Sequence, residues 1–264
     1  MTKRITISTL DAMKSSGDKF VMITAYDATF ARLASEAGAE TILVGDSLGM
    51  VLQGHETTIP VSLDAMVYHT ECVARAKPRS LIVADLPFMS FSNSDDAPHA
   101  STQLMQAGAQ IVKLEGGTWL SDSINRLVER GVPVCAHLGL TPQSVNVFGG
   151  YRVQGRTPKE AKSILADAVE IQDAGASLLV LECIPAELAG DIASKLDIPV
   201  IGIGAGGGTD AQVLVLHDML GMTESAPKFV QNFMKGADSI QDALATFVRA
   251  VKSGEYPQEE HTYS

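Results

Sequence analysis

Short apolar runs alternate with longer amphipathic stretches along the whole chain. The apolar runs are too short for helices and too continuous for strands with one face in water, so they are typical of buried parallel strands. The stretches between them have the apolar spacing of surface helices. We expect seven strands and a weaker eighth, at residues 20–24, 41–44, 80–84, 111–114, 132–136, 178–181, 198–203 and 213–216.

The ends of the predicted helices have recognisable signals. An acidic or amide residue followed by Ala-Gly-Ala occurs at 36–39, 106–109 and 173–176, each time between an amphipathic run and an apolar one. Glycine at such a place is a common helix stop. Thr157, Pro158 and Glu160 have the pattern of a capping box with proline at the first helical position, which predicts a helix from Thr157 to about Asp173.

Strand and helix therefore alternate in units of roughly 30 residues, which predicts a closed (β/α)8 TIM barrel rather than an open sheet. The length of 264 residues fits one such domain spanning residues 1–264, because these barrels typically have about 250 residues. The glycine-rich segment 139–156 breaks the alternation and is either a lid or binding loop, or a structural excursion or oligomer contact. The segment 223–251 is expected to form a pair of extra C-terminal helices for packing or assembly.

The charge of the chain excludes several classes of partner. It has 20 basic and 31 acidic residues and a net charge of -11, without a basic run, so we expect no nucleic acid and no anionic membrane as partner. No apolar stretch reaches the roughly 18 residues of a membrane-spanning helix. Three cysteines without CxxC spacing are typical of a protein in the reducing cytoplasm. An acidic small-molecule substrate would need local cations in its site.

Ionisable residues stand at the ends of the predicted strands. The C-terminal ends of all strands meet at one face of a parallel barrel, so these side chains are expected to become neighbours. Lys113 and Glu115 are two residues apart in one strand and therefore point the same way. The candidate site residues from this pattern are Asp46, Asp85, Lys113, Glu115, His137 and Glu182.

Three of these residues predict a metal site. Asp46, Asp85 and Glu115 offer only oxygen ligands, which suit Mg2+ together with water and substrate oxygens. A single strand-end acid can equally cap a helix or pair with a surface base, but three at corresponding positions favour the metal. His137 either hydrogen-bonds the residues around the metal or has no role. Cys135 is not expected to act as a nucleophile.

The glycine-rich segment 202–208 follows the seventh predicted strand. Loops near strands seven and eight of such barrels can bind phosphate, and a tight turn that leaves the mouth of the barrel open is the alternative. The pattern does not separate these two interpretations.

Longer motifs make the family recognisable. The motifs are Thr-Ala-Tyr-Asp at 24–27, Val-Gly-Asp-Ser-Leu-Gly-Met at 44–50, Ala-Asp-Leu-Pro-Phe at 84–88, Val-Lys-Leu-Glu-Gly at 112–116, His-Leu-Gly-Leu-Thr-Pro-Gln-Ser at 137–144, Gly-Gly-Tyr-Arg-Val-Gln-Gly at 149–155, Leu-Glu-Cys at 181–183 and Gly-Ile-Gly-Ala-Gly at 202–206. They cover essentially the whole chain and, in this order, resemble those of ketopantoate hydroxymethyltransferase.

The resemblance implies a reaction. It is the transfer of a hydroxymethyl group from 5,10-methylenetetrahydrofolate to 3-methyl-2-oxobutanoate through a Mg2+-stabilised enolate, which gives 2-dehydropantoate in the biosynthesis of pantothenate and coenzyme A. The resemblance also implies a (β/α)8 barrel and a homo-oligomer, commonly a decamer.

The matching motifs also imply roles for individual residues. Asp46 and Asp85 would ligate Mg2+, and Glu115 would complete the coordination directly or through water. Asp46, Ser47, Asp85 and Lys113 would bind the oxo acid. Glu182 would be the catalytic residue, as the proton acceptor.

Two other functions compete with this one. A magnesium-dependent barrel lyase or mutase resembling the isocitrate lyase and phosphoenolpyruvate mutase group would share the enolate chemistry, but its Lys-Lys-Cys-Gly-His-like motif is not found in this sequence. A non-catalytic metabolite-binding barrel is the second alternative. Binding alone does not need Glu182 opposite a metal site, which favours an enzyme.

Overall fold

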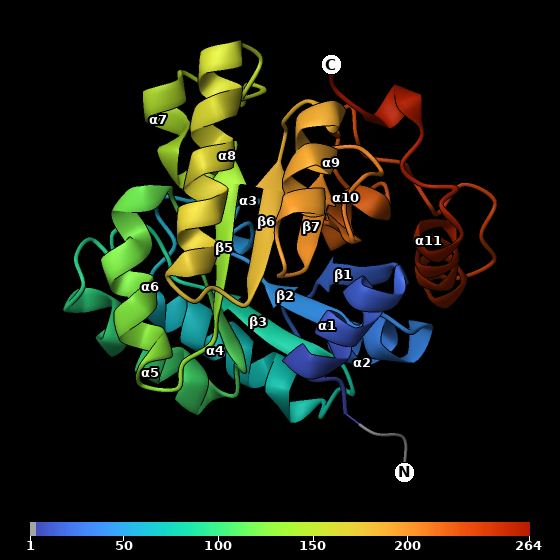
Figure 1. Ribbon diagram of the computed structural model, residues 1–264. Coiled ribbons are helices and arrows are strands. Elements are labelled where there is room, and N and C mark those ends of the chain that lie inside the picture. The colour runs from blue at the N-terminus through green and yellow to red at the C-terminus, as the bar shows by residue number, and fades with distance from the viewer. Residues whose placement is uncertain (1–3) are drawn as a thin grey trace.

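The computed structural model describes residues 4–264, in which eight parallel strands close into a barrel (Figure 1). The strands follow one another around the barrel in chain order, and β8 pairs with β1 to close it. The predicted (β/α)8 barrel is therefore confirmed. The strands are β1 Phe20–Thr24, β2 Thr41–Val44, β3 Leu81–Asp85, β4 Ile111–Glu115, β5 Val134–Gly139, β6 Leu178–Glu182, β7 Val200–Ile203 and β8 Ala211–Leu214.

Four strands continue further toward their C-terminal ends than the apolar runs indicated. The backbone ladder includes the pairs Asp85 with Lys113, Glu115 with His137, and Gly139 with Glu182. Polar residues therefore belong to the strands themselves, because hydrogen bonding between backbones does not depend on side-chain polarity. The ladder thus holds the ends of β3 to β6 in fixed register.

The eighth strand lies two residues before its predicted position. Ala211 pairs with Phe20, and Leu214 pairs with Ile23. The polar residue Gln212 hid this start, although its side chain is buried and satisfied. Its amide donates hydrogen bonds to the Gly206 carbonyl and to the Thr209 hydroxyl, both at 2.9 Å.

The helices surround the barrel (Figure 1). The α-helices are α1 Ile7–Ser16, α2 Ala28–Ala37, α3 Leu48–Val51, α4 Leu63–Arg75, α5 Asp96–Ala107, α6 Ser121–Val128, α7 Val145–Phe148, α8 Pro158–Asp173, α9 Ala186–Lys195, α10 Leu216–Met219 and α11 Ile240–Ser253. Short 3-10 turns occur at Thr118–Leu120, Pro142–Ser144 and Glu259–His261.

The predicted helix signals are confirmed. Gly38 and Gly108 end α2 and α5 in the left-handed conformation. At the start of α8 the Thr157 hydroxyl accepts a hydrogen bond from Glu160 N, and the Glu160 carboxylate accepts one from Thr157 N. These local interactions place the helix boundaries where the sequence indicated.

The prediction of two extra C-terminal helices was wrong in its first half. Within 223–251 the structure contains α11, whereas residues 223–239 are turns and irregular segments. Phe229 and Phe233 are four residues apart, as in a helix, and both are buried. Phe233 packs instead on the rings of Phe247 and Tyr256, at centroid distances of 5.2 and 5.5 Å. Tertiary packing, and not helical periodicity, accounts for that spacing.

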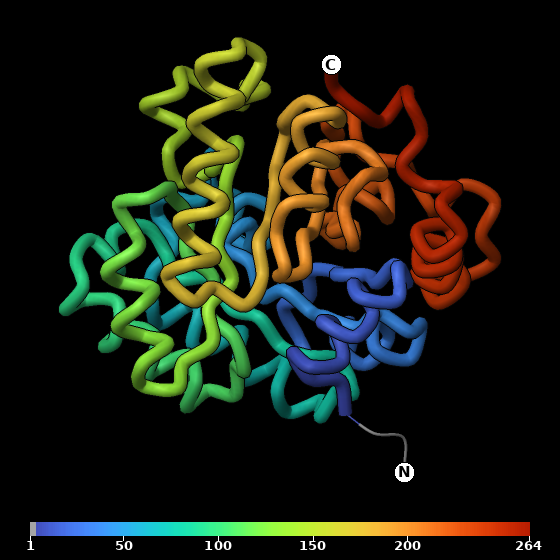
Figure 2. Tube along the Cα trace, viewed as in Figure 1, coloured from blue at the N-terminus to red at the C-terminus, as the bar shows by residue number. Residues whose placement is uncertain are grey.

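The first described residues, before α1, and the C-terminal residues lie at opposite ends of the view in Figure 2. The C-terminal residues and α7 lie at the end toward which β5 and β6 point (Figure 1). The catalytic face of such barrels is the C-terminal end of the strands, so both segments can shape it. No helix within residues 4–264 is long and apolar enough to cross a membrane.

Candidate active site

A cavity of about 850 Å3 opens at the C-terminal ends of the strands. The predicted site residues Asp46, Ser47, Asp85, Lys113, Glu115, His137 and Glu182 all line it. The segments before and after α7 supply a second part of the wall, through Leu140, Pro142, Tyr151, Arg152 and Val153. The segment 139–156 therefore forms part of the binding cavity.

Two buried aspartates form the first part of the site. Asp85 ends β3, and its Oδ2 accepts a hydrogen bond from Asp46 N at 3.0 Å. Burial raises the pKa of Asp46 well above its usual value, and the neighbouring carboxylates of Asp85 and Glu115 raise it further. Ionised carboxylates this close together are costly unless a cation lies beside them.

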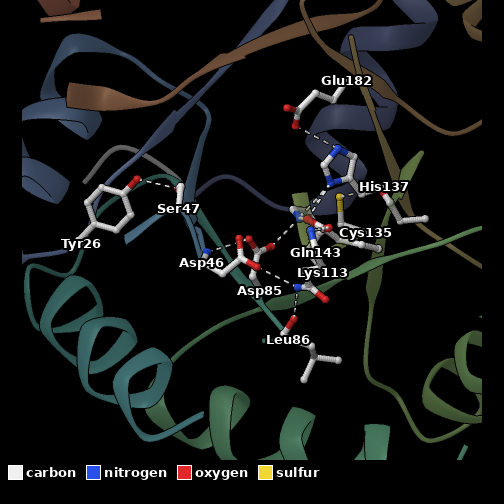
Figure 3. A network of polar contacts seen from close by, with 12 residues as sticks. Tyr26, Asp46, Ser47, Asp85, Leu86, Lys113, Cys135, His137, Gln143 and Glu182 are labelled. Carbon is white, nitrogen blue, oxygen red and sulfur yellow. Dashed lines mark hydrogen bonds and ion pairs between the residues drawn. The ribbon is translucent and has the colours of Figure 1, made fainter. Parts of the chain in front are cut away.

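Lys113 supplies one such cation (Figure 3). Its Nζ lies 2.8 Å from Asp85 Oδ1 and 3.3 Å from Glu115 Oε1, and the side chain is buried. Burial by itself would lower the pKa of Lys113, but Asp85, Glu115 and Asp46 outweigh this effect and raise it above its usual value. The lysine therefore stays charged inside the barrel.

His137 links two glutamates across the ends of β4, β5 and β6 (Figure 3). Its Nδ1 lies 3.1 Å from Glu115 Oε1, and its Nε2 lies 3.3 Å from Glu182 Oε2. Burial and Lys113 act to lower the pKa of His137, but hydrogen bonding to Glu115 and Glu182 and the charge of Glu115 raise it to about 9. An imidazolium can donate to both glutamates at once. The sequence left a role for His137 open, and the geometry places it in contact with Glu182.

Glu115 is held by its neighbours on every side. Its Oε1 contacts Lys113 and His137, and its Oε2 accepts a hydrogen bond from Gln143 N at 3.0 Å. Burial would raise the pKa of Glu115, but Lys113, His137 and these hydrogen bonds lower it to about 2. Because both oxygens have partners, any contact of Glu115 with a metal ion would most simply go through water.

Ser47 follows Asp46 and is oriented by an aromatic residue. The Ser47 and Tyr26 hydroxyls form a hydrogen bond of 2.9 Å (Figure 3). The Tyr26 side chain is buried. A serine hydroxyl can donate one hydrogen bond and accept others, so Ser47 can still form a hydrogen bond with a ligand while it contacts Tyr26.

Sequence reasoning missed Gln143. This buried side chain donates from Nε2 to Asp46 Oδ2 and to the Leu86 carbonyl, both at 2.9 Å (Figure 3). Its backbone N–H binds Glu115, so the residue holds two of the predicted metal ligands in place. Gln143 lies within the motif at 137–144, but its polar type alone gave no signal of this role.

A metal site is not preformed by three side chains. Within residues 4–264 no group of three His, Cys, Asp or Glu residues is arranged to hold a metal ion by itself. The metal assignment of Asp46, Asp85 and Glu115 therefore stays a prediction. What the structure brings together is a pair of buried aspartates beside an open cavity, with Glu115 behind Lys113.

The cysteines do not have the properties of nucleophiles. Burial raises the pKa of Cys135 to about 12 and also raises that of Cys183. A reactive cysteine needs a stabilised thiolate, and both thiols are far from that state.

The glycine-rich segment 202–208 packs against protein groups. A Cβ added at Gly206 would lie 2.4 Å from Ala186 Cβ, and one added at Gly204 would lie 2.7 Å from the Phe229 ring. Close packing thus accounts for these glycines. Of this segment, Ile203 lines the cavity in the part of the chain that the structure describes. This arrangement favours the tight turn over a phosphate loop.

Replacing Gly139 by alanine is expected to lower the free energy of unfolding by about 2 to 4 kcal/mol. Gly139 has a φ of 90°, and an added Cβ would lie 2.2 Å from the carbonyl oxygen of Glu182. Urea denaturation would measure the loss. Gly131→Ala is the control, because Gly131 has a φ of 80° but open space around it, so about 1 kcal/mol is expected. Equal losses would contradict the steric explanation.

Known proteins are similar to this chain over its full length. The family model of ketopantoate hydroxymethyltransferase matches residues 4–259. The 3-methyl-2-oxobutanoate hydroxymethyltransferase 2 of Pseudomonas entomophila is 57% identical over 262 residues, 98% of each chain. The 3-methyl-2-oxobutanoate hydroxymethyltransferase of Marinobacter nauticus is 57% identical over 260 residues, again 98% of each chain.

A solved structure shares the fold at low sequence identity. Phosphoenolpyruvate phosphomutase from Streptomyces platensis subsp. rosaceus is 16% identical with a TM-score of 0.62, covering 94% of this chain and 88% of that one. This likeness concerns the barrel alone, whereas the full-length sequence identity identifies the family. The chain belongs to the ketopantoate hydroxymethyltransferase family and is a transferase enzyme.

Proposed function

We propose that this enzyme transfers a one-carbon unit from 5,10-methylenetetrahydrofolate to 3-methyl-2-oxobutanoate as a hydroxymethyl group, with one water consumed to supply the hydroxyl, giving 2-dehydropantoate and tetrahydrofolate for pantothenate and coenzyme A biosynthesis. The observation that supports this most is the arrangement of Asp46, Asp85 and Lys113 on one side of the cavity and Glu182 on β6. An oxo acid bound by the first group would present its C3 to a carboxylate. This is the arrangement that proton removal next to a carbonyl requires.

The charges of the site fit a divalent cation. The three buried carboxylates of Asp46, Asp85 and Glu115 face Lys113 and His137, while Glu182 adds a further acid. Mg2+ is usually bound through one or two carboxylates and otherwise by water and substrate oxygens. Asp46 and Asp85 would hold it, with Glu115 acting through water. A bound Mg2+ would polarise the 2-oxo group and favour the negative oxygen of an enolate.

The side chains around the oxo acid would share three tasks. Lys113 would attract its carboxylate or 2-oxo oxygen, and Ser47 would donate a hydrogen bond to it. Glu182 would take the C3 proton. His137, whose Nε2 lies 3.3 Å from Glu182 Oε2, would hold the Glu182 carboxylate in place through this ion pair.

Glu182 is favoured over His137 as the base. The charge of Glu115 and hydrogen bonding to Glu115 and Glu182 raise the pKa of His137 to about 9, which favours the protonated imidazole near neutral pH. A protonated imidazole cannot accept the C3 proton. A metabolite-binding barrel without catalysis would have no need for a carboxylate held in this way.

Deuterium exchange at C3 of 3-methyl-2-oxobutanoate tests the proposed chemistry. Proton NMR in D2O should show loss of the C3 signal when enzyme and Mg2+ are present, and much slower loss after chelation with EDTA. The samples contain no folate at first. If tetrahydrofolate must bind before exchange can begin, the C3 signal will start to decrease only after tetrahydrofolate is added. The absence of exchange under both conditions would contradict the proposed function.

The remaining predictions concern assembly and location. A homo-oligomer, commonly a decamer in the family, and a cytoplasmic location stay proposals from the resemblance and the composition. Sedimentation equilibrium of the purified chain would test the assembly.

A further inference from the structure

The cavity has a second side that the oxo acid does not need. Asp46 follows β2, whereas Asp85, Glu115 and Glu182 end β3, β4 and β6. Around the closed barrel, β7, β8 and β1 complete the circle. Their contribution to the wall is mainly apolar, through Thr24, Ile203, Val213 and Val215. Above them the wall continues with Met222, Pro227, Phe229 and Tyr263.

The size of the cavity fits two ligands. Its volume of about 850 Å3 lies in the upper part of the range of roughly 300 to 1,000 Å3 that proteins use for drug-sized ligands. A small branched oxo acid would fill a minor part of it. The apolar side is therefore available for a larger, flat co-substrate.

One acid stands on this apolar side. Asp218 lies in α10, directly after the β8 wall, and its side chain lines the cavity. Its Oδ1 accepts a hydrogen bond from the Thr223 hydroxyl. Within residues 4–264 no lysine or arginine forms an ion pair with Asp218. Burial raises the pKa of this carboxyl group above its usual value. A half-buried carboxylate with remaining lone pairs is suited to accept N–H groups of a ligand.

The turn that carries Asp218 is fastened to the oxo-acid side. Leu216 N donates to Thr24 Oγ1 at 2.9 Å, which ties the turn to β1. The ring of His217 lies 5.7 Å from the ring of Tyr26, whose hydroxyl bonds to Ser47. The residue before Asp218 thus packs on the tyrosine that is hydrogen-bonded to Ser47.

We infer that Asp218 binds the pterin of the folate co-substrate. The inference rests on the proposed function. The transferred methylene carbon bridges N5 and N10, so the pterin end of the folate must lie next to the oxo acid. The 2-amino group and the N3–H of a pterin form two parallel donors, which match one carboxylate. The flat ring then lies along the apolar wall of β7 and β8.

Other acids of the cavity are less suited to this role. Glu182 contacts His137, while Asp46, Asp85 and Glu115 surround Lys113 on the far side. Glu56 is exposed at the rim, after β2. Asp218 is therefore the carboxylate that lies on the side left for the co-substrate.

Asp218→Asn tests the inference through the two substrates separately. The KM for 5,10-methylenetetrahydrofolate should rise about 10- to 100-fold, because an amide NH2 then faces the donors of the pterin. The KM for 3-methyl-2-oxobutanoate and its Mg2+-dependent C3 exchange should change less than about twofold. Asp218→Glu, which keeps the carboxylate, should recover part of the folate affinity.

Glu224→Gln is the matched control. It removes an exposed carboxylate close to Asp218 in sequence that does not line the cavity, so the KM for the folate should stay within about twofold of wild type. An unchanged folate KM in Asp218→Asn would overturn the inference, and so would an equal loss in Glu224→Gln. If the wild type fails to exchange the C3 proton with or without tetrahydrofolate, the proposed function itself is wrong. These failures are therefore distinguishable.

Discussion

Replacing Glu182 by glutamine is expected to lower kcat by about 100- to 10,000-fold, the range that a positioned general base contributes. Glutamine keeps the size of the side chain and a carbonyl oxygen that can accept from His137 Nε2, which lies 3.3 Å from Glu182 Oε2 in the structure. The amide cannot accept the C3 proton. Because Glu182 is not needed for binding, the affinity for the oxo acid should change less than about threefold.

Steady-state kinetics and calorimetric titration with the oxo acid measure the two effects. Glu187→Gln is the control, since Glu187 is exposed on α9, close to Glu182 in sequence, and is expected to leave kcat unchanged. The C3 exchange rate should fall together with kcat. A Glu182→Gln enzyme with normal turnover would remove Glu182 from the role of base.

Replacing Asp46 by asparagine is expected to weaken binding of the oxo acid in the presence of Mg2+ by about 100-fold or more. The variant removes one buried negative charge but keeps an oxygen that can accept from Gln143 Nε2. Asp46 is a better position than Asp85 for testing the metal site, because Asp85 also forms an ion pair with Lys113 at 2.8 Å. Breaking that buried pair would also cost about 3 to 5 kcal/mol of stability.

Calorimetric titration with and without EDTA measures this effect. Wild-type binding should weaken when Mg2+ is removed, whereas binding by Asp46→Asn should already be weak and respond little to EDTA. Glu56→Gln removes an exposed carboxylate at the rim of the same cavity and should behave like wild type. Full Mg2+-dependent binding by Asp46→Asn would rule out the metal assignment of this residue.

Much of the barrel was predictable because its signals are local. Continuous apolar runs predict buried parallel strands, and glycine stops such as Gly38 and Gly108 end helices through their own backbone conformation. The capping box of Thr157 and Glu160 lies within four residues. Where a local signal was ambiguous, the prediction failed. Residues 223–239 do not form the first of the two expected C-terminal helices, and Gln212 concealed the start of β8.

The sequence also determined which of the predicted site residues line the cavity. In a closed parallel barrel the strand ends meet at one face, and the predicted residues all line the cavity there. Period-two alternation placed Lys113 and Glu115 on the same face, and they form an ion pair of 3.3 Å. Neither conclusion needed the positions of distant residues.

Only the tertiary structure decided which side chains touch. The contact of Gln143 with Asp46 joins residues 97 apart in the chain, and the turn at Leu216 meets Thr24 across 192 residues. The sequence left open whether His137 has a role, and the closed barrel places it between Glu115 and Glu182. Whether a hydrogen bond forms depends on differences of a few tenths of an ångström in the distance between donor and acceptor. Strand register and side-chain packing together determine these distances. Periodicity determines the face on which a residue lies, but closure of the barrel determines its partners.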